Sequence, residues 1–347
     1  MADIINIRDA GHIKDYGILA FCFRYKMLEG ELITTDGQKV EIIDAGLRNR
    51  NAGPDFFNAK IRLDGKLWIG NVVILGNTGD WNKHSLSENK YYANTILVVC
   101  LSADEKLIDI NGNPMPVLIA SVPFHVRQNY QRLLTDGGCD LCRSNVAENV
   151  STLTKRSWMA VLETEWLEER VGQLKTMATK NEWADILAGE IATNNIATKA
   201  QRQDFMKNIF DAENIADMRK VVSNYLSSFN LPHGRMAVEK LIVNTICPFL
   251  FAYGCQKGKD AITDKAFDVI TETLPLETKN TKVWKEKGIE IKTGGNSKAV
   301  ERLQREYCDK KKCLHCRFGF EFLKKKGSSN QQTSTRREPM QLAFWFC

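Results

Sequence analysis

The amino-acid sequence predicts a β-rich α/β domain followed by an α-helical domain. Between residues 31 and 120, short β-branched and aromatic runs alternate with the turn signals Asp36-Gly37, Asp64-Gly65 and Asn111-Gly112, which are typical of β-hairpins. From Leu153 onward, apolar residues recur every three to five positions between charged ones, which is the period of amphipathic helices. A chain of 347 residues with 43% apolar side chains is long enough for about two domains and too apolar to be wholly disordered.

The α/β part is expected to begin with an amphipathic helix over residues 14–28. Strands follow wherever an apolar or alternating run is bounded by turn residues. The run Leu67–Leu75 is almost continuously apolar, which predicts a strand buried on both faces. A helix near residues 122–134 and a loop over Thr135–Ser144 close this part. The expected strands are residues 31–34, 39–43, 58–63, 66–75, 94–101, 106–110 and 115–120.

The helical part is expected to start with a long amphipathic helix from Leu153. The sequence after Lys326 is polar and of low complexity, which predicts disorder, although it closes on the apolar run QLAFWFC. The expected domain limits are 1–135 for the α/β domain, 145–326 for the helical domain and 327–347 for the tail. Further helices are expected at residues 182–191, 199–209, 215–227, 235–256, 260–273 and 297–307.

The chain is expected to be cytoplasmic. Its first residues carry no apolar core of a secretory signal. The longest apolar stretch, Leu241–Tyr253, is interrupted by Asn244, Thr245 and Pro248, whereas a membrane-spanning helix needs about 20 apolar residues. No membrane contact is therefore predicted, and the oligomeric state is left open. Disulfides do not persist in a reducing compartment, so the ten cysteines need other roles.

The most distinctive segment runs from Asn49 to Leu75. It places Pro54-Asp55 directly before a predicted strand, a hairpin turn and a buried strand. This layout resembles the PD-(D/E)XK nuclease core, in which an Asp and an acidic residue on the next strand bind Mg²⁺, while a Lys or similar group beside the second acid handles the attacking water. Oxygen ligands suit this chemistry because Mg²⁺ prefers octahedral oxygen coordination and stabilises the charge developing on the phosphate.

The chain also resembles an uncharacterised bacterial family of unknown function. Members of that family read AGPDFxNAxI and LWxGNVEIH near the N-terminus and YCxxKxCLxC near the C-terminus. The resemblance covers most of residues 15–326. The stretches that carry it are Ala52–Ile61, Leu67–Val73, Gly79–His84, Tyr92–Val99, Val243–Lys257 and Tyr307–Gly319.

This chain departs from the family pattern at the residues that a nuclease would need. The Glu of GNVEIH falls on Val73 and its His falls on Leu75, while Asp55 and His84 remain as candidate catalytic residues. One carboxylate alone cannot hold a hydrated Mg²⁺ well. The resemblance therefore implies a catalytically degenerate, nuclease-like protein that binds nucleic acid or a partner protein, and not an enzyme. Two further family positions, an Asp and a His, fall on Asn89 and Val98.

Several alternatives stay open at this point. Asp55 is equally explained as a loop residue that accepts backbone N–H groups, and His84 as a surface histidine. An active Mg²⁺-dependent nuclease or phosphodiesterase would pair Asp55 with Asp80, Glu41 or Asp44. A purely structural or assembly protein would bind no nucleic acid.

A cluster of cysteines near the C-terminus predicts a metal site. Its spacing is C-x4-C-x2-C, and structural zinc and iron–sulfur clusters are both held by four such ligands. Some PD-(D/E)XK nucleases hold an iron–sulfur cluster with three C-terminal cysteines and one distant one, which favours that reading by analogy. Reduced thiols without a metal are the alternative. The three local cysteines are Cys308, Cys313 and Cys316, and the fourth ligand would be Cys139, Cys142 or His315.

The basic residues gather at the same end. Residues 308–347 hold nine Lys and Arg against three acidic residues, which accounts for the whole net charge of +6. Clustered lysines supply the sequence-independent part of nucleic-acid binding, although Phe318, Phe320 and Phe322 between them suit core packing better than base stacking. The candidate nucleic-acid contacts are Lys310, Lys311, Lys312, Lys324, Lys325 and Lys326.

Overall fold

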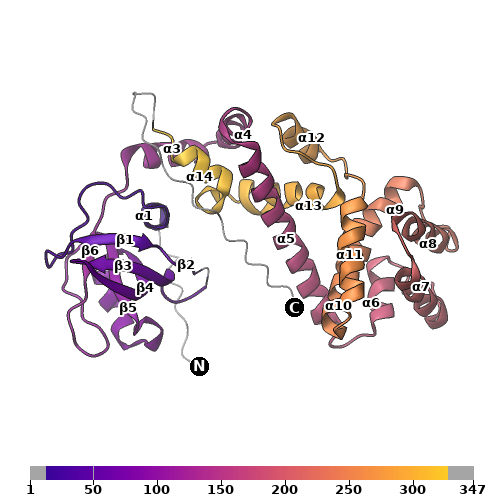
Figure 1. Ribbon diagram of the computed structural model, residues 1–347, viewed down its shortest axis with the longest axis horizontal. Coiled ribbons are helices and arrows are strands. Elements are labelled where there is room, and N and C mark those ends of the chain that lie inside the picture. Colours follow the sequence, from indigo (N-terminus) through magenta and orange to yellow (C-terminus); the bar gives the residue numbers. More distant parts are fainter. Residues whose placement is uncertain (1–12, 50, 327–347) are drawn as a thin grey trace. The chain divides into compact units, whose positions relative to one another are not determined.

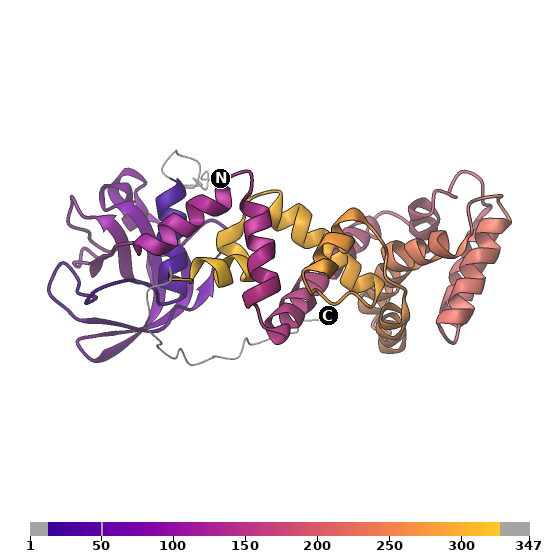
Figure 2. The ribbon, with the colours of Figure 1, turned by 90° about the horizontal axis from the view of Figure 1, so that it is seen from above.

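The computed structural model describes residues 13–49 and 51–326, which form two compact units (Figures 1 and 2). The first unit runs to Thr135 and takes in residues 322–326 at the end of the described chain. The second unit comprises Asp136–Glu321. A mixed β-sheet region is thus followed by a mostly helical part, and the predicted fold class is confirmed. The predicted tail, 327–347, lies outside the described residues.

The first unit is built on a mixed sheet with the strand order β1-β3-β4-β5-β6, and β2 pairs with β3 beside this path. β1, β3 and β4 are antiparallel neighbours, whereas β4, β5 and β6 run parallel. The elements are α1 (Ile13–Arg24), β1 (Val40–Asp44), β2 (Leu47–Arg48), β3 (Phe56–Leu63), β4 (Lys66–Asn77), α2 (Gly79–Lys83), two 3₁₀ turns (Leu86–Glu88 and Lys90–Tyr92), β5 (Thr95–Ser102), β6 (Val117–Ile119) and α3 (Phe124–Leu134).

The strand register assigns the side chains to two faces. Ile61 lies opposite Trp68 on the face that includes Phe56, whose ring packs against Phe23 of α1 with 5.0 Å between centroids. The pairs Lys60–Ile69 and Arg62–Leu67 occupy the other face, because successive side chains of a strand alternate. Farther along β4, that second face is covered by Trp81, Leu86, Leu107 and Met115.

The prediction that Leu67–Leu75 is buried on both faces is wrong for its first part. Leu67 and Ile69 are 51% and 56% exposed. The reason is that β4 pairs with β5 only from Asn71 onward. The first half of β4 is paired with β3 alone in the β3–β4 hairpin, and within residues 13–49 and 51–326 its second face is left exposed.

Two other local predictions differ from the structure. Residues 31–34 and 106–110 form isolated bridges, such as Ile33–Lys39 and Ile108–Pro114, instead of strands. The loop expected over Thr135–Ser144 is largely helical, because α4 begins at Gly138. The sequence assigns the Gly137-Gly138 pair to a loop, but the pair marks the start of α4. Val146 of this helix is buried in the core of the second unit.

The second unit consists of helices, and the long helix α5 packs against α10 and α13 (Figure 1). α12 was not expected from the sequence. The elements are α4 (Gly138–Asn149), α5 (Thr152–Met177), α6 (Trp183–Glu190), α7 (Lys199–Asp211), α8 (Ile215–Ser227), α9 (Arg235–Leu241), a π-helical turn (Ile242–Ile246), α10 (Cys247–Lys257), α11 (Asp260–Glu272), α12 (Lys279–Glu286), α13 (Gly294–Arg302), a second π-helical turn (Leu303–Cys308), a 3₁₀ turn (Cys313–His315) and α14 (Arg317–Leu323), which ends in the first unit.

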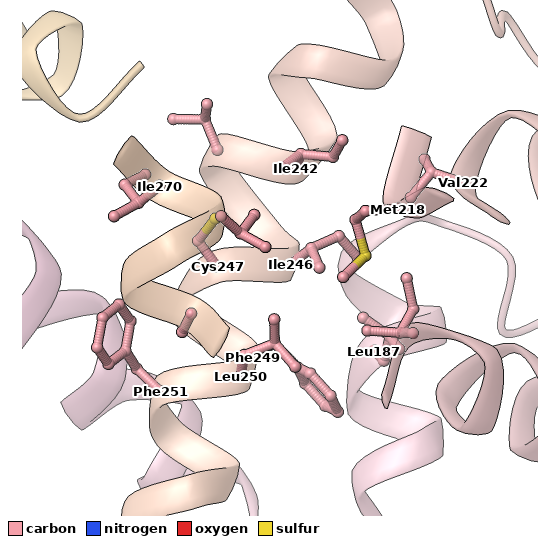
Figure 3. Close-up of a cluster of buried hydrophobic side chains, with 14 of the residues drawn as sticks. Leu187, Met218, Val222, Ile242, Ile246, Cys247, Phe249, Leu250, Phe251 and Ile270 are labelled. Carbon is pink, nitrogen blue, oxygen red and sulfur yellow. The ribbon is translucent and has the colours of Figure 1, made fainter. Parts of the chain in front are cut away.

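The main core of the second unit surrounds the segment from α9 to α10. Figure 3 shows Ile246 and Phe249 of this segment facing Leu187 of α6 and Met218 of α8. The continuous helix Arg235–Lys257 is long and apolar enough to cross a membrane by length and composition, but 67% of its most apolar window is buried inside the structure. Its composition is explained by its place in the core.

Candidate functional site

The carboxylate of Asp55 is engaged by the surrounding fold. Its Oδ1 accepts a hydrogen bond from the hydroxyl of Tyr16 in α1, and its Oδ2 accepts one from the backbone N–H of Ile74 in β4 at 2.9 Å. The guanidinium of Arg48 lies 3.8 Å from Oδ1. Asp55 is only 3% exposed. Two hydrogen-bond donors and one guanidinium, from three elements, therefore converge on one buried carboxylate.

The local sequence explains this position. The β3–β4 pairing ends with Phe56 opposite Val72, so the next inward N–H of β4, that of Ile74, has no β3 carbonyl as partner, and Asp55 supplies the acceptor instead. The preceding loop is held by Asn49, whose side-chain amide donates to the carbonyl of Pro54 at 2.9 Å. A buried backbone N–H must be paired, which gives Asp55 a structural role.

The family's Glu and His positions lie in an apolar cluster. Val73 and Leu75 are 2% and 3% exposed, and they pack with Val98, Cys100 and Trp81. Asn89, at the position of the family's Asp, accepts the N–H of Tyr91 at 3.0 Å and so begins a 3₁₀ turn.

The other acidic candidates serve elsewhere. Glu41 forms an exposed ion pair with Arg62 at 3.0 Å, and Asp44 accepts the N–H of Gly46 at 2.9 Å. Asp80 lies in the first turn of α2, and His84 is half-buried at the end of the same helix. Among residues 13–49 and 51–326, no three His, Cys, Asp or Glu side chains are placed to hold a metal ion.

The five cysteines that the sequence singled out meet in the second unit, and we call them the cysteine cluster. Cys142 and Cys308 pack against the buried cluster that contains Cys316, and the sulfurs of Cys139 and Cys313 are close enough to raise the pKa of Cys142, after the larger effect of its burial. Two distant segments are thereby joined. The members are Cys139 and Cys142 of α4, Cys308 at the end of the second π-helical turn, and Cys313 and Cys316 of the turn before α14.

The thiols of the cysteine cluster differ in their protonation. A hydrogen bond from the thiol of Cys308 stabilises the thiolate of Cys139 and so lowers the pKa of Cys139. The same bond raises the pKa of Cys308, because it is lost when Cys308 gives up its proton. Burial, followed by the neighbouring sulfurs, raises the pKa of Cys142. Burial also raises the pKa of Cys316 to about 12, although the backbone N–H groups of Gly319 and Phe318 oppose this increase. Cys316 is the buried member of the cluster, and the other four cysteines are half-buried.

One side-chain hydrogen bond and one close backbone approach hold the segments of the cysteine cluster in place. Arg143 of α4 donates to the side chain of Gln304 in the second π-helical turn at 2.8 Å. At the other end, a Cβ on Gly319 would lie 2.1 Å from the carbonyl oxygen of Cys313, so only glycine allows the first turn of α14 to approach that closely.

The six lysines are divided between the two units. Lys310–Lys312 belongs to the second unit and Lys324–Lys326 to the first. Lys310 is paired with Glu306 at 2.6 Å. Phe318 and Phe322 are buried, so these two rings are not available for base stacking.

Sequence reasoning missed an exposed apolar surface on the first unit, which we call the apolar patch. Its four side chains lie on the second face of the sheet, where the β3–β4 hairpin is uncovered. The signal was present in the alternation of β3 and β4, but only the strand register assigns these residues to one face. The members, with their exposed fractions, are Leu47 (70%), Phe57 (36%), Leu67 (51%) and Ile69 (56%).

A family model described as a protein of unknown function (DUF2851) matches residues 17–230. This match includes most of the first unit and the part of the second that precedes α9. No curated protein and no solved structure matches the chain significantly. The matching family carries no activity with it.

Proposed function

The chain belongs to the DUF2851 family of unknown function, and we propose that its first unit is a catalytically degenerate, nuclease-like scaffold that binds a partner protein. The proposal rests on the contacts of the Asp55 carboxylate, which is hydrogen-bonded to Tyr16 and Ile74 and lies beside Arg48. In a nuclease this carboxylate would bind the metal. Here it holds α1, β2 and β4 together.

The order of elements supports the nuclease-like part of the proposal. α1 is followed by the antiparallel strands β1, β3 and β4, and the chain then crosses to β5, which is parallel to β4. Pro54-Asp55 precedes β3, as the sequence resemblance leads one to expect. The scaffold is therefore compatible with such a core.

The chemistry supports the loss of catalysis. Mg²⁺ requires several oxygen ligands in near-octahedral geometry, and a two-group hydrolysis needs a second acid near the first. The position expected for that acid is Val73, inside an apolar cluster. Glu41 and Asp44 are engaged elsewhere, which weakens the alternative of a shifted acidic pair.

The apolar patch favours a protein as the bound partner. Soluble proteins rarely expose contiguous apolar surface without a binding role, and the central parts of protein interfaces are apolar and poor in charge. On the same face, the cations Lys60 and Arg62 are accompanied by the acidic Glu41, which pairs with Arg62. Because these charges partly cancel, the face attracts a polyanion only weakly, and nucleic acid is therefore the second candidate.

The purified full chain is expected to leave single- and double-stranded DNA and RNA intact in the presence of Mg²⁺ or Mn²⁺. The same labelled oligonucleotides, followed by fluorescence anisotropy at physiological salt, should bind no more tightly than the roughly 10⁻⁴–10⁻⁶ M of non-specific association. Cleavage that Asp55→Asn abolishes would establish the active-hydrolase alternative. Saturable binding well below that range would instead make nucleic acid the partner.

The apolar patch is expected to determine which protein co-purifies with the tagged chain in its native host. Leu67→Ser combined with Ile69→Ser should abolish recovery of a stoichiometric partner, because both side chains are exposed and contribute to the patch. Lys60→Ser on the same face is the matched control and should retain the partner. Unchanged thermal unfolding of both variants would show that the fold is intact. Equal recovery with both variants would rule out the patch as the interface.

A further inference from the structure

We propose that the cysteine cluster binds one soft metal centre through four thiolates, as either a zinc ion or an iron–sulfur cluster. This inference goes beyond the proposed function, because it concerns the second unit and does not depend on the absence of catalysis in the first. Its starting point is the packing of cysteines from two distant segments, because Cys142 of α4 and Cys308 pack against the buried cluster that contains Cys316. Four thiolates suffice for either centre.

Cys142 and Cys316 are the anchor ligands. Cys142 lies one turn after Cys139 on α4, and it packs against the core cluster that contains Cys316. Cys316 is itself buried and follows Cys313 by three residues. These two cysteines therefore bring the two segments together, and each has a second cysteine three residues before it.

Buried polar groups beside the cluster give independent support. Asn145 is 4% exposed, and neither polar atom of its side chain has a hydrogen-bond partner. It lies three residues after Cys142 on α4, hence on the same helix face. Trp158 Nε1 also has no hydrogen-bond partner, and Trp158 belongs to the same buried cluster as Cys316, against which Cys142 and Cys308 pack. Unpaired buried groups are costly, and metal-bound thiolates would supply acceptors.

Binding requires a change in the thiols and not only their proximity. As placed, no three described side chains are positioned to share an ion. On binding, each ligand thiol that still carries a proton releases it to the solvent, and its sulfur turns toward the metal. The nearby cations Arg143 and Lys311 offset the negative charge of a tetrathiolate centre.

The test is the metal content of the full chain purified without oxygen. We expect either zinc at about one equivalent in a colourless protein, or iron with matching acid-labile sulfide and visible charge-transfer absorption. Cys142→Ser and Cys316→Ser should each lose most of the metal. Cys255→Ser, in α10 of the same unit and outside the cluster, is the matched control and should keep it. Trp158→Phe should keep the fold but weaken metal affinity by roughly 10–100-fold.

A second measurement keeps the inference testable if a cysteine variant fails to fold. Metal-free wild-type protein is titrated with Zn²⁺, or reconstituted with iron and sulfide, and its thiols are counted with a thiol-reactive dye. Protection of four thiols supports the inference. Metal-free protein as isolated, with no protection after either treatment, would overturn it, as would equal metal in the Cys142→Ser and Cys255→Ser variants. Neither result bears on nucleic-acid cleavage, so the two proposals fail separately.

Discussion

Val73→Glu is expected to lower the free energy of unfolding by about 3–5 kcal/mol, the usual cost of an uncompensated buried charge. Val73 is 2% exposed and its neighbours are Leu75, Val98, Cys100 and Trp81. None of these can neutralise a carboxylate. Glu is the residue that the family pattern has at this position. In this chain, its carboxylate would lie among buried apolar side chains.

The matched control for this substitution is Ile69→Glu. Ile69 lies on the same strand and the same face, four residues earlier, and is 56% exposed. Its replacement should change stability by no more than about 0.5 kcal/mol. Urea denaturation of both variants measures the difference. If Val73→Glu were tolerated as well as Ile69→Glu, water would reach this part of β4, and space for a metal site would exist.

The same reasoning applies to the double substitution Val73→Glu with Leu75→His. Both positions belong to one apolar cluster, so we expect the variant to unfold instead of regaining hydrolysis. A family motif can therefore be lost in a way that point substitutions do not reverse, because neighbouring side chains have filled the volume of the site.

Much of the fold could be predicted because periodicity and turn chemistry are local. The turn at Asp64-Gly65 places the β3–β4 hairpin, and the apolar period from Leu153 places α5. The exposure of Leu67 and Ile69 could not be predicted, because it depends on where β5 begins to pair with β4. That pairing depends on tertiary structure. The amino-acid sequence of an apolar run does not show whether another element covers it.

The candidate sites were predictable as residue types but not as contacts. The sequence indicated Asp55, yet Tyr16 and Arg48 reach it from α1 and β2, and nothing local signals these partners. The spacing of Cys308, Cys313 and Cys316 indicated a cluster. The turn signal before Cys139 concealed that α4 would bring two more sulfurs to it.

Asp55→Ala is expected to lower the free energy of unfolding by about 2–4 kcal/mol, because a charge-assisted hydrogen bond is lost and the buried N–H of Ile74 is left unpaired. Glu41→Ala is the matched control. It removes a carboxylate from an exposed ion pair, which contributes at most about 1 kcal/mol. The free energy of unfolding distinguishes a structural carboxylate from a metal ligand, because removing a structural carboxylate must lower the stability of the fold.

The most direct measurement is therefore the unfolding free energy of wild type and Asp55→Ala, each with and without millimolar Mg²⁺. A ligand that binds only the folded state raises its stability. Our account predicts that Asp55→Ala is strongly destabilised and that Mg²⁺ leaves both proteins unchanged. A wild-type protein that Mg²⁺ stabilises, together with an Asp55→Ala variant that is as stable as wild type and insensitive to Mg²⁺, would contradict it.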